Sequence, residues 1–322
     1  MGAVSTRFSV ARLGLIFTLA LAFGTREALP ASSQPVVPGT GQRLAQVGDD
    51  FEDQGWGYQF HLPKVTRDLD DQDRLPAGEA ANGRWYEGMR RGQPDVVQRV
   101  PTPAGGVAGS QGALLLQSLW TGIPGQPRNS LGQDDLIADV NYRLGGSIPA
   151  AWSPSVVVHV FLPPVDNWEN RTGPHFGFRA AVETSVVKAG PGVRFSQSRP
   201  ETETYWPGLF IEFQSKARAD DHDYAYFRIR GNEKGEDVRS QPITTTGWWT
   251  LGMSISPDGL VHYYASPGVD ALTQVDYLGA QAPYGFRAEA FKTFFFNVCS
   301  GDDGRNWSTP WIIDDPSVFV VR

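Results

Sequence analysis

Apolar and polar residues alternate with a period of two along several segments of the second half of the chain, from about residue 155 onward. In the segment 224–230, two tyrosines and two arginines alternate with Ala225, Phe227 and Ile229. Successive side chains of an extended strand point to opposite faces, whereas a helix repeats its faces every 3.6 residues. The alternation therefore predicts strands with one buried face and one solvent-facing face.

Turn residues separate these segments, as Pro257-Asp-Gly259 does between two of them. Segments with a helical period are scarce, and residues 270–275 form at most a short turn. Many short strands joined by turns are typical of an all-β sandwich or barrel. We therefore predict two antiparallel sheets packed as a jelly roll, with few or no helices. Besides 224–230, the expected strands are 156–162, 175–183, 209–214, 248–256, 260–265, 293–299, 311–315 and 318–321.

The first 24 residues have the features of a secretory signal peptide. Arg7 and Arg12 precede an apolar run over 13–23, which ends near the small residues Ala20, Ala22 and Gly24. The run is too short to cross about 30 Å of hydrocarbon comfortably, and no later stretch is long and apolar enough to do so. We expect cleavage, no membrane span, and a location outside the cell, in the periplasm or in the cell envelope.

Residues 25–48 are rich in Pro, Gly and Ser, and we expect a disordered spacer there. Residues 49–322 would then form a single β-sandwich domain, loop-rich up to about residue 150 apart from a buried strand at 112–118. The formal net charge is −7. This acidic balance argues against nucleic acid as a partner. With Cys299 as its one cysteine, the chain cannot form an intramolecular disulfide and depends on its core.

Four segments together resemble the jelly-roll domains of the concanavalin A-like lectin/glucanase superfamily. They are Asp50-Phe-Glu-Asp53, Gly112-Ala-Leu-Leu-Leu-Gln117, the hairpin 247–259 and Ile312-Ile-Asp-Asp315. The resemblance covers most of residues 49–322. It implies the jelly-roll fold and an association with carbohydrate.

The catalytic motif of the retaining glucanases in this superfamily, Glu-x-Asp-x-x-Glu on one strand, is absent. The nearest strand carries Glu212 alone, followed by Gln214. Retaining hydrolysis needs two carboxyl groups about 5 Å apart. The sequence therefore favours a binding protein over an enzyme.

Polar residues of the central strands form the first candidate site, because neighbouring strands would bring them to one face. Their composition resembles that of jelly-roll polysaccharide lyases, in which Tyr or His removes a proton and Arg or Gln neutralises a uronate carboxylate. The alternative is a solvated face of cross-strand ion pairs. The candidate catalytic residues are His175, Arg179, Glu212, Gln214, Tyr226 and Arg228.

Aromatic residues near strand ends form the second candidate site, since a flat ring can stack on a sugar, although most Trp residues of a sandwich belong to its core. The candidates are Trp168, Trp206, Trp248 and Tyr264. The segment Ser300-Gly-Asp-Asp-Gly-Arg-Asn-Trp307 resembles the Asp-box turn of secreted β proteins. The resemblance implies that Ser300 and Asp302 bond the turn backbone, that Gly304 has a positive φ, and that Trp307 tucks under the hairpin.

Acidic residues gather at both ends of the predicted domain. If the first and last strands pair, their oxygens could cage a structural calcium ion; otherwise they are solvated strand-end acids. No other cofactor is indicated. The candidate metal ligands are Asp50, Glu52, Asp314 and Asp315.

The leading hypothesis is a secreted protein that binds, or is associated with, a poly- or oligosaccharide. The first alternative is a polysaccharide lyase or glycoside hydrolase that acts on the polar sheet face. The second is a structural module of the cell envelope.

Overall fold

Two antiparallel sheets form the framework of the computed structural model, which describes residues 35–188, 199–216 and 222–322. The predicted signal peptide lies outside these residues. Sheet A has the strand order β17 (Tyr277–Gln281), β16 (Val261–Pro267), β15 (Gly247–Ile255), β9 (Ser155–Leu162), β19 (Trp311–Val320), β6 (Ala113–Gln117) and β5 (Val96–Val100), and β1 (Gln42–Arg43) pairs with β19.

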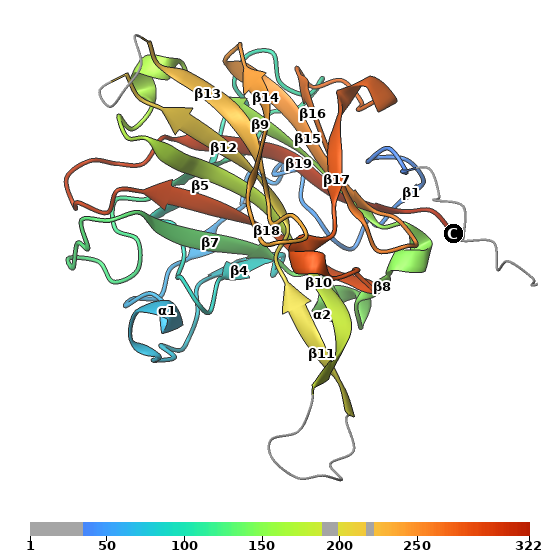
Figure 1. Cartoon of the computed structure of the whole chain (residues 1–322). Helices are drawn as coiled ribbons and strands as arrows, with labels where there is room; N and C mark the ends of the chain where they lie inside the picture. Colours follow the sequence, from blue (N-terminus) through green and yellow to red (C-terminus); the bar gives the residue numbers. More distant parts are fainter. Residues whose placement is uncertain (1–34, 189–198, 217–221) are drawn as a thin grey trace, which may run out of the picture. The chain divides into compact units, whose positions relative to one another are not determined.

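Sheet B is the larger sheet, and its long strand β10 extends beyond its neighbours to pair with β11 (Figure 1). The strand β8 (Ile148–Pro149) pairs with β18. The order of sheet B is β14 (Val238–Ile243), β13 (Tyr224–Arg230), β12 (Gly208–Gln214), β10 (Gly173–Lys188), β18 (Ala290–Ser300), β7 (Gly132–Ala138), β4 (Trp85–Glu87), β3 (Glu79–Ala80) and β2 (Tyr58–Gln59), with β11 (Arg199–Tyr205) beside β10.

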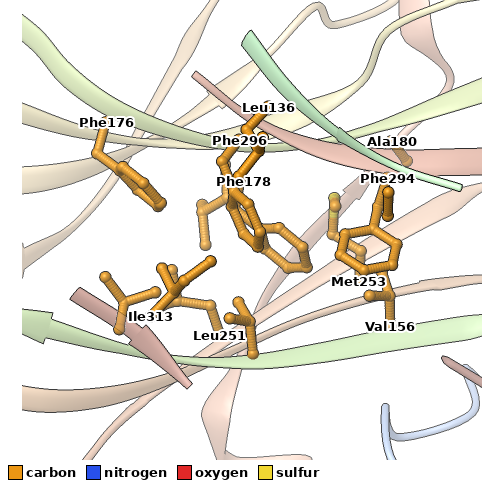
Figure 2. Close-up of a cluster of buried hydrophobic side chains, with 14 of the residues drawn as sticks. Leu136, Val156, Phe176, Phe178, Ala180, Leu251, Met253, Phe294, Phe296 and Ile313 are labelled. Atoms are coloured by element: carbon orange, nitrogen blue, oxygen red, sulfur yellow. The ribbon is translucent and has the colours of Figure 1, made fainter. Parts of the chain in front are cut away.

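The core lies between the two sheets, where rings from β10 and β18 meet aliphatic side chains of sheet A (Figure 2). Phe178 stacks on Phe296 with ring centroids 5.9 Å apart. Each large apolar side chain buried in this way stabilises the fold by about 1.5–3 kcal/mol. Since Ala225, Phe227 and Ile229 point into this core, the alternation predicted for β13 is confirmed.

The predicted fold class is confirmed, because two antiparallel sheets dominate and the α-helices α1 (Arg67–Asp70) and α2 (Asn141–Leu144) have four residues each. Among the residues that the structure describes, no helix is long and apolar enough to cross a membrane.

The N-terminal part of the chain is more ordered than the sequence indicated. Residues 35–48 fall in the segment expected to be a spacer, yet β1 pairs with β19 and Val47 is buried in the core. The folded part therefore begins before residue 49. The region expected to be loop-rich up to residue 150 also supplies strands β2 to β8.

Candidate functional site

The outer face of sheet B carries a cluster of arginines and aromatic rings, which we call the arginine face: Arg179, Phe210, Arg228, Arg230 and Arg239. These residues come from β10, β12, β13 and β14, which are consecutive neighbours in the sheet. Phe210 pairs with Arg228 in register, and Arg228 pairs with Arg239. Three strands therefore bring a ring and two guanidinium groups into one row.

Arg179, on β10, belongs to the arginine face and is only 5% exposed. Its guanidinium carbon lies 5.6 Å from the ring centre of Phe210 and 5.2 Å from that of Phe295. Its Nη2 donates to the carbonyl of Trp206 at 2.5 Å, while its Nε has no hydrogen-bond partner in the described part of the chain. Burial lowers the pKa of Arg179 to about 10, and Arg230 adds to the effect, but the group stays charged at neutral pH.

Glycine at position 208 makes room for Arg179. A Cβ atom there would lie 2.6 Å from Cγ of Arg179 and 3.1 Å from the carbonyl oxygen of Phe178. Any larger residue on this neighbouring strand would displace the arginine.

Glu212 and Arg228 form an ion pair on the same face. Arg228 also contacts Asp237 at 3.3 Å. Burial raises the pKa of Glu212, and the positive charge of Arg228 opposes that rise. One oxygen of Glu212, Oε2, has no partner among the described residues. This part of the face matches the cross-strand ion-pair alternative.

Arg230 and Arg239 remain without a carboxylate partner in the ranges that the structure describes. Arg239 lies over the rings of Tyr226, at 4.1 Å, and Tyr224, at 5.2 Å. Arg239 also lies directly across from Arg228, and like charges in that position destabilise a sheet. The face therefore carries positive charge that the described protein groups do not neutralise.

Four of the six predicted catalytic residues come together, and Gln214 and His175 do not. Arg179, Glu212, Tyr226 and Arg228 come together on the outer face of sheet B. Gln214 lies near the end of β12, where its Nε2 donates to the hydroxyl of Thr172 at 3.3 Å.

The predicted position of His175 on this face is wrong. A register shift between Pro174 and Phe176 turns its side chain inward, where its ring lies 5.7 Å from that of Trp168 and 5.4 Å from that of Phe213. Its Nε2 donates to the carbonyl of Arg171 at 2.8 Å. Burial lowers the pKa of His175 to about 3. The ring is therefore neutral and has no access to a ligand on sheet B.

Of the predicted stacking residues, Trp206 is the accessible one. It is 39% exposed, and Arg90 lies 5.6 Å from its ring centre. Its backbone carbonyl accepts a hydrogen bond from Arg179, so Trp206 lies at the border of the arginine face.

The other three predicted stacking residues are largely covered by protein. Trp248 is buried against Phe161, and its Nε1 donates to the carbonyl of Pro103 at 3.3 Å. Tyr264 is fully buried. Trp168 packs against Trp311, with ring centres 5.2 Å apart.

The four predicted metal ligands lie close enough to influence one another. Glu52 accepts hydrogen bonds from the backbone of Gln111 and Gly112, whereas Asp314 accepts one from the Ser110 hydroxyl at 2.8 Å. Burial raises the pKa of Asp314 to about 7, and the charges of Asp315 and Glu52 contribute. Burial also raises the pKa of Asp315. The positive charge of Arg43 opposes this rise, and the negative charge of Asp50 adds to it.

Within residues 35–188, 199–216 and 222–322, no group of three or more His, Cys, Asp or Glu side chains is placed to hold a metal. Calcium binding by these acids stays a prediction, which melting curves with and without a chelator can test.

The turn that resembles an Asp-box matches its prediction in part. Ser300 accepts a hydrogen bond from the backbone of Asp302 at 3.0 Å, and Gly304 has a φ of +66°. Asp302 instead bonds the neighbouring loop, and the turn backbone is held by Asp303. The expected burial of Trp307 is wrong, because Trp120 covers Gly304 and leaves Trp307 exposed.

Several residues of the site escaped the sequence analysis. Phe210 and Phe295 look like core residues because they flank other apolar positions, yet they lie on the outer face beneath Arg179. Asn297 and Asp135 hydrogen-bond to each other beside them. No periodicity marks them, since Asp135 lies in a strand that was not predicted.

Some solved structures align with the chain at low similarity. A carbohydrate esterase from the Shiga toxin-encoding bacteriophage phi24B aligns with a TM-score of 0.42 at 12% identity, over 74% of this chain and 91% of that chain. An alginate lyase from Pseudomonas aeruginosa gives 0.37 at 11% identity, over 71% and 87%. A GH131 β-glucanase catalytic domain from Podospora anserina gives 0.37 at 12% identity, over 85% of both chains.

No protein-family model and no curated protein matches the chain. At these identities and TM-scores, the structural alignments assign neither a family nor an activity.

Proposed function

We propose that the protein binds an acidic polysaccharide on the arginine face of sheet B. The observation that carries the proposal is Arg179, a buried charge whose Nε lacks a partner among the described residues, beside two arginines without a carboxylate. A charge in a low-dielectric site acts over a longer distance than one in water. Arg230 and Arg239 can reach a ligand, while Arg179 strengthens the positive potential beneath them.

The chemistry of the surrounding residues favours a polysaccharide over other polyanions. Trp206 offers a partly exposed ring at the border of the arginine face, and such rings stack on the apolar faces of sugars. The net charge of −7 repels any long polyanion, so binding of one depends on the local positive charge of the arginine face. The resemblance of the sequence to lectin-like jelly rolls agrees with a carbohydrate ligand.

Binding rather than catalysis is the function that these contacts support. A lyase on this face needs a base within reach of the C5 proton. His175 is turned away, and Tyr226 lies beneath Arg239. Products that absorb in the near ultraviolet, formed from a polyuronate, would instead establish lyase activity.

The test measures the affinity of the protein for polygalacturonate, alginate and a sulfated polysaccharide by isothermal titration calorimetry. We expect Arg239→Ala and Arg230→Ala each to weaken binding by about three- to tenfold, because each loses one charge contact of about 1 kcal/mol. Arg43→Ala is the control, since it removes an exposed arginine, paired with Asp315, from sheet A. Absence of binding to all three polymers, or equal losses in all three variants, would refute the proposal.

A further inference from the structure

A concave site that shares no residue with the arginine face lies between the segments 166–171 and 301–308. We call it the Trp307 cleft; its volume is about 830 Å³, within the range of small-molecule sites in proteins. Its lining combines the ring of Trp307 with amide and charged side chains.

Trp307 presents its ring at the surface of this cleft and is 43% exposed. The turn that carries it is well supported, because the Asp303 carboxylate accepts hydrogen bonds from the backbone of Arg305 and Asn306, both at 2.8 Å. Gly304 closes the turn with a positive φ. An exposed indole on such a braced turn loses little freedom when it binds, and this is favourable for stacking.

Amide side chains dominate the rest of the lining. Asn129 and Asn167 form no side-chain hydrogen bond to any residue that the structure describes. Asn170 uses its Oδ1 to accept the hydroxyl of Ser215 at 2.5 Å. Each free amide offers both a donor and an acceptor, and adjacent sugar hydroxyls need that combination.

The charges of the Trp307 cleft are opposite to those of the arginine face. The lining contains three carboxylates, Asp166, Glu169 and Asp303, against one cation. That cation, Arg171, already contacts Glu169 at 3.0 Å. Glu169 also accepts a hydrogen bond from the backbone of Gly301 at 2.7 Å. The net negative charge of the cleft would repel an anionic sugar, whereas it would not repel an uncharged sugar.

We infer that the Trp307 cleft is a second carbohydrate site that takes an uncharged sugar chain, with Trp307 stacking on a pyranose face and Asn129 and Asn167 bonding its hydroxyls. The inference goes beyond the proposed function and does not depend on it, because the two sites share no residue. A protein with both sites would hold an acidic and a neutral glycan at once.

The test is affinity gel electrophoresis of the protein in gels that contain neutral polysaccharides: a β-glucan, a xylan, a mannan and a galactan. We expect at least one of them to retard the wild type, and Trp307→Ala to weaken that binding about tenfold or more. Trp307→Phe should retain part of the affinity because it keeps a ring. Asn167→Ala should weaken binding less than Trp307→Ala.

Trp152→Ala is the matched control, since Trp152 is 37% exposed and lies under Arg322, which is not part of the cleft. It should migrate as the wild type does. Arg239→Ala should also retain neutral binding, and this separates the inference from the proposed function. If no neutral polymer retards the wild type, or if Trp307→Ala migrates as the wild type does, the inference is wrong.

Discussion

Individual residues show where alternation assigns a side chain to the correct face and where it does not. Arg179 and Glu212 lie on the outer face of sheet B, as a period of two predicts. His175 does not, because one register shift in β10 reverses the face of the residue before Phe176. The shift depends on how β10 pairs with β12, which lies more than 30 residues away in the sequence, so no local pattern could indicate it.

Asp314 should make the stability of the protein depend on pH. An acid with a pKa of about 7 in the folded protein, against 3.8 when unperturbed, binds its proton more tightly in the folded state. Its contribution to stability is therefore present below about pH 4 and is lost as the pH rises through 7. We expect Asp314→Asn to be more stable than the wild type at pH 8 by about 2 kcal/mol, and to lose less stability between pH 4 and 8.

Denaturant unfolding at a series of pH values measures this effect. Ser110→Ala is the opposing variant, because its hydroxyl bonds the Asp314 carboxylate and lowers its pKa. Loss of this hydroxyl should raise the pKa of Asp314 further, so the stability of Ser110→Ala should depend on pH more steeply than that of the wild type. Equal slopes in all three proteins would contradict the assignment.

At the scale of elements, β7 is one of the strands that sequence patterns did not reveal. It contains two adjacent acids, Asp134 and Asp135, which are unfavourable in a buried strand. The fold pairs each of them on its own face: Asp134 with the buried Lys64 at 2.9 Å, and Asp135 with Asn297. Both partners are distant in sequence. Strands β12 and β13 are neighbours in sequence and pair Glu212 with Arg228 between themselves, so their alternation alone was enough.

The stability of the turn over residues 300–307 should depend more on the buried carboxylate of Asp302 than on the exposed carboxylate of Asp303. Asp302 accepts hydrogen bonds from the backbone of Thr121 at 3.1 Å and from Nε of Arg128 at 2.9 Å. Asp302→Ala leaves these donors unpaired, and we expect a loss of about 3 kcal/mol in the free energy of unfolding. Asp303→Ala removes exposed hydrogen bonds only and should cost about 1 kcal/mol or less.

Chemical denaturation of the two variants gives the comparison. Asp302→Asn should recover part of the loss, because it keeps one acceptor and tolerates the positive φ at this position. If Asp302→Ala were no less stable than Asp303→Ala, the turn would not depend on the buried contact.

At the scale of the whole molecule, the N-terminal segment belongs to the sandwich. Its composition indicated a spacer, because Pro and Gly are common in linkers and a two-residue strand leaves no periodicity. Tertiary contacts decide otherwise: Pro38 packs over Gly252, where a Cβ atom would lie 2.8 Å from its ring, and Val47 is buried. A short segment becomes ordered when it can pair with a strand of the sheet and bury an apolar side chain, as β1 and Val47 do.

A chain that begins at residue 49 should be less stable than one that begins at residue 35. It loses the pairing of β1 with β19 and the burial of Val47, and we expect a reduction of about 3 kcal/mol in the free energy of unfolding. Thermal and denaturant melting of the two chains measure it. Gly252→Ala in the longer chain should also lose stability, because its Cβ atom would displace Pro38 together with Leu272. Identical melting of the two chains would show that residues 35–48 contribute nothing.

The opposite charges of the two proposed sites predict different responses to salt. Contacts between exposed arginines and a polyanion weaken as the Debye length falls from about 10 Å at 0.1 M salt to about 3 Å at 1 M. Binding of polygalacturonate should therefore weaken at least about tenfold over that range, and Arg239→Ala should reduce the dependence. Stacking on Trp307 involves no ion pair, so binding of a neutral glycan should change by about twofold or less. Calorimetric titrations of one protein sample with both ligands at several salt concentrations decide the matter. Two parallel salt dependences would mean that a single surface binds both ligands, and a competition titration would then find that each displaces the other.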